Sequence, residues 1–274
     1  MPIETKVFYH KGQIPAVGKK QNLFFLYGGK NQKNIAQYLD QNQTLIGIIP
    51  PGRGRKEIKT KTVEAFADIH SQQILKIQSQ GPFFICGFSF GGLVAFEIAQ
   101  RFIELGHKVD MLMLIDTFPG DSIREISGLK KIDPPASVSS MNPKEIYKRL
   151  KRKIYRLLNW KFIGDPNRPL DFLCNALLKF HIPLPSKKLR SHYMLRTMRI
   201  AKSRYKFKKY NGKLTYFKAS KYYKEHEQYP KLWQSVVLSD FKSYTIPGEH
   251  LDLLEEPNVK ILAKLIKNII KSKI

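Results

Sequence analysis

A serine flanked by glycines, at the junction between an apolar run and a helical pattern, constrains the fold of this sequence most. The pentapeptide GFSFG at 87–91 follows the apolar run 82–86 and precedes a helical pattern over 93–105. Such a tight strand-to-helix turn needs glycine on both sides of the serine, because larger side chains would collide with the neighbouring backbone. The hydroxyl of Ser89 is therefore predicted to stand above the edge of a sheet as a nucleophile.

The short motif alone is weak evidence for this turn, and the sequence on either side of it strengthens the prediction. The residues before it read as a buried strand, and apolar residues recur after it at helical spacing until Gly106. Phe90 then falls at the N-terminus of the helix, where a backbone N–H is unpaired and the helix dipole is positive. Its amide is predicted to help hold a developing oxyanion.

Strands and helices alternate along most of the chain. We expect strands at 7–9, 23–27, 45–49, 82–86, 111–115, 214–217 and 241–246, a helix from Val63 to Gln80 capped by Thr62, and a closing amphipathic helix from about Asn258. This alternation is typical of an α/β protein with a mostly parallel central sheet. With its G-x-S-x-G turn, the pattern resembles the α/β-hydrolase fold.

The alternation is interrupted in the middle of the chain. Residues 119–143 are rich in Pro, Gly and Ser, and 142–209 reads as helical, basic and interrupted by prolines. We therefore predict a core formed by 1–120 and 210–274 and an inserted helical, basic lid at 121–209. A lid of this kind would cover the strand ends, where open parallel sheets carry their active sites.

Positive charge is the unusual bulk property. The chain has 48 Lys and Arg against 22 Asp and Glu, a formal net charge of +26. Residues 121–210 contain 23 of the basic and 6 of the acidic residues, and the stretch 144–161 is the densest part. Such a field attracts an acidic partner. Charge alone leaves nucleic acid, an anionic membrane and an acidic protein open.

Composition and residue spacing narrow the classes of protein to which this chain could belong. Two cysteines are too few for a disulfide framework, so Cys86 and Cys174 are expected to be free buried thiols. The seven histidines show no metal-binding spacing, so no metal is expected. The N-terminus lacks the apolar core of a signal peptide, and no run of eighteen apolar residues occurs. We expect a cytoplasmic protein without a transmembrane segment.

A serine nucleophile at neutral pH needs a base. His250 is the best candidate, because it lies in a loop between the last strand and the last helix, where the hydrolase order Ser, Asp, His would place it. His226 and His181 lie in polar or lid segments and fit less well. The alternative is a purely structural role, in which His250 is a loop residue that caps the final helix.

The base in turn needs an acid that orients it. Asp116 directly follows the predicted strand at 111–115, which comes after the helix that starts at the Ser89 turn. Glu225 and Glu227 instead lie several residues beyond the next strand, at 214–217. Asp116 is therefore the predicted acid, although an aspartate at a strand end is often only a turn former.

A second oxyanion donor should come from the turn after an early strand. The residues YGGK at 27–30 follow the apolar run 23–26, and glycine lets the backbone approach a substrate closely. We predict the Gly29 amide as the donor, with Gly28 as the alternative. These glycines could also form no more than a flexible turn.

Four segments resemble the thioesterase domains that end nonribosomal peptide and polyketide synthases. They are GPFFICGFSFGGLVAFEIA at 81–99, LIDT at 114–117, PGEH at 247–250 and EPNV at 256–259. The resemblance covers about 7–270 and is weakest in the lid. It implies Ser89 as the acyl-accepting nucleophile, His250 as its base and Asp116 as the orienting acid.

Such enzymes take an acyl or peptidyl chain from the phosphopantetheine arm of a carrier protein and release it to water or to an internal nucleophile. The resemblance implies no directly bound cofactor and an acidic carrier protein, not nucleic acid, as the partner. The positive charge of the lid offers such a carrier protein a docking surface. Lys30 departs from the small or apolar residues usual near the oxyanion loop. This departure and the unusually basic lid leave the acyl substrate and the docking mode open.

Other functions share these residues. An editing (type II) thioesterase or a free-lipid esterase would use the same three side chains, although Phe88 and Phe90 favour the terminal-release type by family analogy. A non-enzymatic alternative is a protein that binds an anionic membrane or nucleic acid through a basic amphipathic helix at 144–161. Oligomeric state is left open by the sequence.

Overall fold

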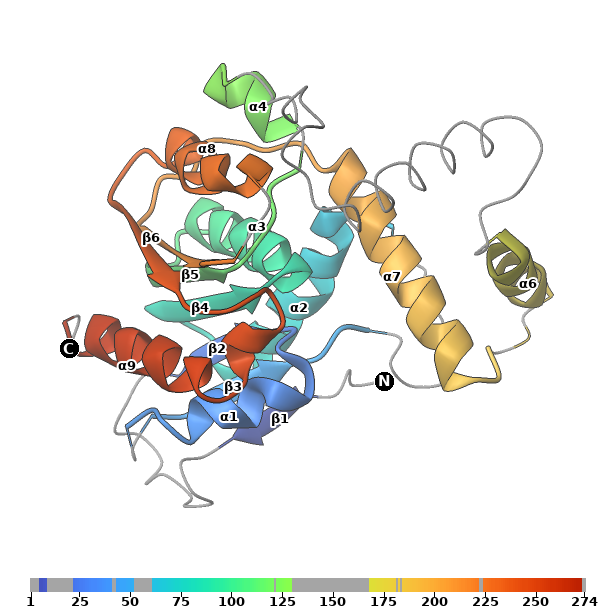
Figure 1. Ribbon diagram of the computed structural model, residues 1–274, viewed down its shortest axis with the longest axis horizontal. Coiled ribbons are helices and arrows are strands. Elements are labelled where there is room, and N and C mark those ends of the chain that lie inside the picture. The colour runs from blue at the N-terminus through green and yellow to red at the C-terminus, as the bar shows by residue number, and fades with distance from the viewer. Residues whose placement is uncertain are drawn as a thin grey trace, which may run out of the picture. The chain divides into compact units, whose positions relative to one another are not determined.

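The computed structural model in Figure 1 describes most of the chain. The described residues are 5–8, 22–40, 43–51, 61–120, 122–129, 168–180, 182, 184–221 and 224–272. The chain divides into two compact units, one formed by Met1–Pro51, Ile58–Lys130 and Thr197–Ile274, the other by Gly52–Glu57 and Lys131–Arg196. The sheet belongs to the first unit. The core and lid boundaries expected from the sequence stay a prediction, and the dense basic stretch 144–161 lies outside the described residues.

Seven strands of the described part form one sheet in the order β1-β3-β2-β4-β5-β6-β7. They are β1 (Thr5–Phe8), β2 (Leu23–Leu26), β3 (Leu45–Ile48), β4 (Phe83–Phe88), β5 (Val109–Ile115), β6 (Leu214–Ala219) and β7 (Phe241–Ile246). β1 runs antiparallel to β3 at one edge, and the other six strands run parallel. Their carboxyl ends therefore meet at one edge of the sheet.

Helices cover both faces of the sheet (Figure 1). α1 (Gln32–Ala36) and α9 (Asn258–Lys271) pack on one face against alternate strand residues such as Phe25, Cys86 and Met113. On the other face lie α2 (Val63–Ile77), α3 (Phe90–Glu104) and α8 (Tyr229–Val236). Burial on both faces explains why the central strands read as continuous apolar runs in the sequence.

The described chain has further helical elements. In the first unit these are η2 (Gly29–Asn31), α4 (Ser122–Ser127), η4 (Lys224–Gln228) and η5 (Asp252–Leu254). α6 (Arg168–Lys179) lies in the second unit, and α7 (Lys187–Arg204) runs from the second unit into the first. Within the described residues, no helix combines the length and apolar character that a membrane crossing requires.

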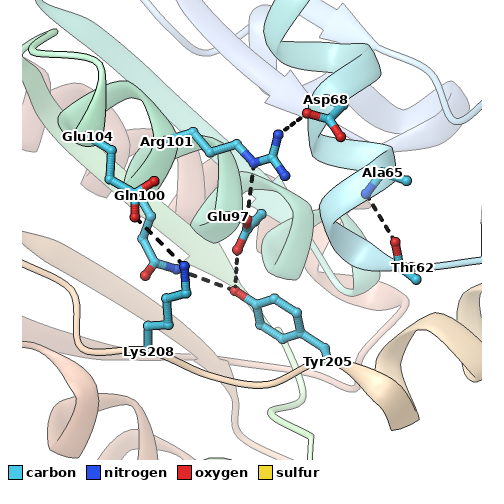
Figure 2. Close-up of polar contacts among 9 residues, drawn as sticks. All are labelled: Thr62, Ala65, Asp68, Glu97, Gln100, Arg101, Glu104, Tyr205 and Lys208. Carbon is cyan, nitrogen blue, oxygen red and sulfur yellow. Dashed lines mark hydrogen bonds and ion pairs between the residues drawn. The ribbon is translucent and has the colours of Figure 1, made fainter.

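Most predicted strands and helices are present, although β1 lies at 5–8 instead of 7–9 and α2 ends at Ile77 instead of Gln80. The start of α2 is capped as expected, because the Thr62 hydroxyl accepts a hydrogen bond of 3.2 Å from the Ala65 N–H (Figure 2). α3 ends just before Gly106, whose φ of +81° suits glycine. Cys86 in β4 and Cys174 in α6 are both buried and neither forms a disulfide, as predicted.

A polar network centred on the buried Glu97 and Tyr205 side chains links several elements of the first unit (Figure 2). The Tyr205 hydroxyl donates to Glu97 over 2.9 Å, and the Arg101 Nε–H donates to the other oxygen of Glu97 over 3.1 Å. Arg101 also pairs with Asp68 on α2. The Ser122 hydroxyl donates to the Tyr205 carbonyl over 2.6 Å. The network thus joins α2 and α3 to the two chain segments that flank the second unit in sequence.

Replacing Tyr205 with phenylalanine tests this network. Tyr205→Phe leaves one oxygen of the buried Glu97 carboxylate without its donor, so the free energy of unfolding should fall by about 1.5–3 kcal/mol. Urea denaturation of the variant measures the loss. The matched control is Tyr210→Phe, because the buried Tyr210 hydroxyl has no hydrogen-bond partner among the described residues. Its removal leaves no hydrogen-bond partner unpaired among the described residues, so stability should not fall. Equal losses in both variants would contradict the network's role.

Candidate active site

The turn between β4 and α3 holds Ser89 in a conformation that few side chains adopt. Its φ is +55° and its ψ is −123°, and its N–H donates to the Ile115 carbonyl over 2.9 Å. A Cβ atom on Gly87 would lie 2.3 Å from the Gly91 carbonyl oxygen. Gly87 is therefore needed because the backbone of the first turn of α3 approaches it too closely for a side chain. The same steric argument led the sequence analysis to predict a sharp turn here.

Ser89, His250 and Asp116 form one hydrogen-bonded chain. His250 Nε2 lies 3.0 Å from Ser89 Oγ, and His250 Nδ1 lies 2.5 Å from Asp116 Oδ2. An ionised carboxylate only accepts, so Nδ1 carries the proton that it donates to Asp116. In neutral His250, Nε2 then presents its lone pair to the Ser89 hydroxyl. Three strand ends bring these residues together: β4 precedes Ser89, β5 precedes Asp116, and the loop after β7 carries His250.

Asp116 is fully buried and held from several sides. Its side chain is 0% exposed, its Oδ1 accepts from the Ala219 N–H over 3.1 Å, and its own N–H donates to the Phe217 carbonyl over 2.7 Å. Burial, together with the nearby charge of Asp116, raises the pKa of the Tyr216 hydroxyl well above its usual value. Because both carboxylate oxygens accept hydrogen bonds, Asp116 is held in place inside the protein and fixes the orientation of His250.

Two phenylalanine rings flank the imidazole. The Phe88 ring is stacked on His250 at 4.8 Å between centroids and 18° between planes, and the Phe118 ring lies at 4.8 Å and 32°. The rings restrict the orientation of the imidazole plane. The sequence analysis gave no role to Phe118, although it lies only two residues after Asp116.

The weaker candidates for base and acid lie elsewhere. His226 is part of η4, and its ring stacks on Tyr229 at 4.7 Å and packs on Phe118 at 5.1 Å. Glu227 belongs to the same short helix, and His181 lies outside the described residues. No group of three His, Cys, Asp or Glu suited to a metal ion occurs among the residues that the structure describes.

The predicted oxyanion donors lie on neighbouring segments. Phe90 is the first residue of α3, and Gly29, with φ +62°, begins η2. A Cβ atom on Gly91 would lie 2.6 Å from the Leu26 carbonyl oxygen and 2.7 Å from Tyr27 Cβ. The turn after β2 therefore packs directly on the first turn of α3. The roles of the Phe90 and Gly29 amides stay a prediction.

A buried histidine beside this turn was missed by the sequence analysis. His70 on α2 is 0% exposed, and its Nε2 lies 2.7 Å from the Tyr27 hydroxyl. Its Nδ1 lies 2.7 Å from Gln73 Oε1, and burial lowers the pKa of His70 to about 4. The available signal was its helical spacing: His70 falls four residues after Phe66 and four before Ile74, on the apolar face of α2.

The lowered pKa of His70 makes stability depend on pH. In the unfolded chain its pKa is near 6.5, so between pH 6.5 and 4 the unfolded state binds more protons and stability falls as pH falls. Replacing His70 with glutamine removes this titration. Between pH 7 and 4.5, the free energy of unfolding should fall by about 2–3 kcal/mol less in His70→Gln than in the wild type. Urea denaturation at both pH values measures this difference, and parallel pH profiles would contradict a buried neutral His70.

The chain matches a known family over part of its length. The family model described as Thioesterase domain matches residues 29–151, a range that contains the Ser89 turn and Asp116. Curated relatives are large synthetases. Enterobactin synthase component F of Escherichia coli (strain K12) is 31% identical over 88 residues, which is 32% of this chain and 7% of that protein. Inactive atromentin synthetase invA4 of Paxillus involutus is 26% identical over 110 residues, 39% of this chain and 12% of that protein. The matches thus span a small part of these relatives.

Solved structures extend the likeness across the whole fold. The NocB thioesterase domain, crystallised as a covalent complex with a fluorophosphonate nocardicin G analog, has a TM-score of 0.64 and 15% sequence identity. The match covers 97% of this chain and 99% of that domain. The predicted α/β-hydrolase fold is therefore confirmed. In sequence and in fold the chain resembles the thioesterase domains of nonribosomal peptide synthetases. This confirms the resemblance found in the segments around Ser89, Asp116 and His250.

Proposed function

We propose that this protein is a serine thioesterase that removes an acyl or peptidyl chain from the phosphopantetheine arm of a carrier protein. The observation that carries the proposal is the hydrogen-bonded chain from Ser89 Oγ through His250 to Asp116, with distances of 3.0 and 2.5 Å. This order of hydroxyl, imidazole and buried carboxylate activates a serine for attack on a carbonyl. The match to the Thioesterase domain model supports the choice of thioester as the bond that is cleaved.

The first half-reaction forms an acyl-enzyme. Ser89 Oγ attacks the thioester carbonyl while its proton passes to His250 Nε2, and the positive imidazole is held by Asp116 and flanked by Phe88 and Phe118. The tetrahedral intermediate collapses, the C–S bond breaks, and the departing thiolate takes the proton from Nε2. An ester to Ser89 and a free thiol on the carrier arm result.

The second half-reaction releases the chain. Water, or a hydroxyl or amine within the acyl chain, gives a proton to His250 Nε2 and attacks the ester carbonyl. The proton then returns to Ser89 Oγ as the ester bond breaks, which gives a free acid or a ring. In both halves the negative oxygen is stabilised by the amides of Phe90 and Gly29, and one such donor is typically worth a factor of about 10² to 10³ in rate.

Charge favours an acidic carrier protein as the partner. A formal net charge of +26 would speed the approach of an acidic domain, and we propose that it docks on the basic lid at 121–209. The curated relatives are synthetases of which this chain matches a small part, and one similar solved structure is a four-domain nonribosomal peptide synthetase. Two buried cysteine thiols that form no disulfide fit a reducing compartment, so we propose action in the cytoplasm.

Labelling at Ser89 tests the proposed function. The protein is incubated with a fluorophosphonate and, separately, with a panel of acyl-cysteamine thioesters, and the modified residue is located by mass spectrometry. We expect phosphonylation at Ser89 and thioester turnover in the wild type. Ser89→Ala should lose the label and at least about 10³-fold of the turnover, because the covalent route is removed.

The matched control is Ser235→Ala on α8, whose hydroxyl donates to the carbonyl of Leu232 one turn earlier. This variant should label and turn over like the wild type. The products distinguish hydrolysis from ring closure, and the preferred acyl chain distinguishes terminal release from editing. Unchanged thioester turnover in Ser89→Ala would overturn the proposal.

A further inference from the structure

Tyr27 has an unusual backbone conformation at the turn that would supply an oxyanion donor. Its φ is +66°, although it is not a glycine, and it lies two residues before Gly29. A tyrosine in this region of backbone space persists only where the surroundings hold it. The contacts of its side chain therefore decide the geometry of the turn.

Two contacts hold the Tyr27 side chain. Its ring stacks on the Phe90 ring at 6.1 Å between centroids and 17° between planes, and the Phe90 ring in turn meets Phe66 edge-on at 5.4 Å. Its hydroxyl lies 2.7 Å from His70 Nε2. The Tyr27 side chain thus contacts both Phe90, the first residue of α3, and His70 on the buried face of α2. Of the two amides proposed as oxyanion donors, one belongs to Phe90, whose ring Tyr27 contacts, and the other to Gly29, two residues after Tyr27 in the same turn.

The hydrogen bond between Tyr27 and His70 has a defined direction. Gln73 Oε1 accepts, so the proton of the neutral imidazole is on Nδ1, and Nε2 accepts from the Tyr27 hydroxyl. Burial lowers the pKa of His70 to about 4 and raises that of Tyr27 well above its usual value. At neutral pH both groups are therefore uncharged, and the hydroxyl is fixed as the donor.

We propose that Tyr27 and His70 are positioning residues that set the distance between the Phe90 and Gly29 amides and so shape the oxyanion site. This inference rests on the proposed thioesterase function. Neither side chain takes part in bond breaking. Their effect is on the transition state, because an oxyanion needs its donors at about 2.7–3.1 Å, and a small misplacement can cost up to about 10²-fold in rate.

The test removes each end of the hydrogen bond separately. Tyr27→Phe deletes one oxygen and keeps the ring stack on Phe90, and His70→Leu removes the acceptor. For acyl-cysteamine thioesters we expect kcat to fall about 10- to 100-fold in each variant, with KM changed less than about twofold. The double variant should be no slower than the slower single variant, because the two residues act as one unit.

Two further variants separate positioning from a loss of stability. The side-chain amide of His70→Gln offers an acceptor near the position of Nε2, so this variant should regain kcat to within about threefold of the wild type. Tyr210→Phe removes a buried hydroxyl elsewhere in the first unit, one that has no hydrogen-bond partner among the described residues, and should leave kcat unchanged. Thermal unfolding of every variant is measured in the assay buffer. Should His70→Leu fail to fold, Tyr27→Phe decides the question alone.

The outcomes distinguish this inference from the proposed function. Wild-type kcat in Tyr27→Phe, or independent multiplying losses in the double variant, would overturn the positioning role and leave the thioesterase proposal intact. A wild-type protein that turns over no thioester and takes no fluorophosphonate at Ser89 would overturn both.

Discussion

The hydrogen bond of 2.5 Å between His250 Nδ1 and the buried Asp116 carboxylate is the interaction on which the site depends. A carboxylate that is removed from water needs donors on its oxygens, and here the Ala219 N–H supplies one and the imidazole the other. The same bond fixes which nitrogen of His250 carries the proton and which one faces Ser89. The rings of Phe88 and Phe118 restrict the plane of the imidazole but select no tautomer.

Backbone strain gathers at the carboxyl ends of three adjacent strands. Among the described residues, the non-glycine residues with positive φ are Tyr27 after β2, Ser89 after β4 and Asp116 after β5. Each turns the chain sharply where a strand stops, so that a side chain or an amide points along the sheet edge. Such conformations cost free energy and persist where packing enforces them. The sheet, the Glu97 and Tyr205 network and the helices on both faces supply that rigid support.

Much of this fold could be predicted because its signals are local. Apolar runs, the Thr62 cap and the glycines around Ser89 each act within a few residues. Position at a strand end selected Asp116, and the loop before the last helix together with the hydrolase chain order selected His250; the structure brings the two into contact. The Tyr27–His70 hydrogen bond could not be found this way, because it joins residues 43 positions apart and a histidine on an apolar helix face usually marks only the core. Phe118 was missed for a similar reason, since ring stacking on His250 leaves no pattern in the sequence.

A structure of the fluorophosphonate adduct would test the central claim most directly. The account predicts a bond between phosphorus and Ser89 Oγ, with the phosphonyl oxygen about 2.7–3.1 Å from the amide nitrogens of Phe90 and Gly29 and with His250 still bonded to Asp116. An adduct on another residue, or a phosphonyl oxygen turned away from both amides, would contradict it.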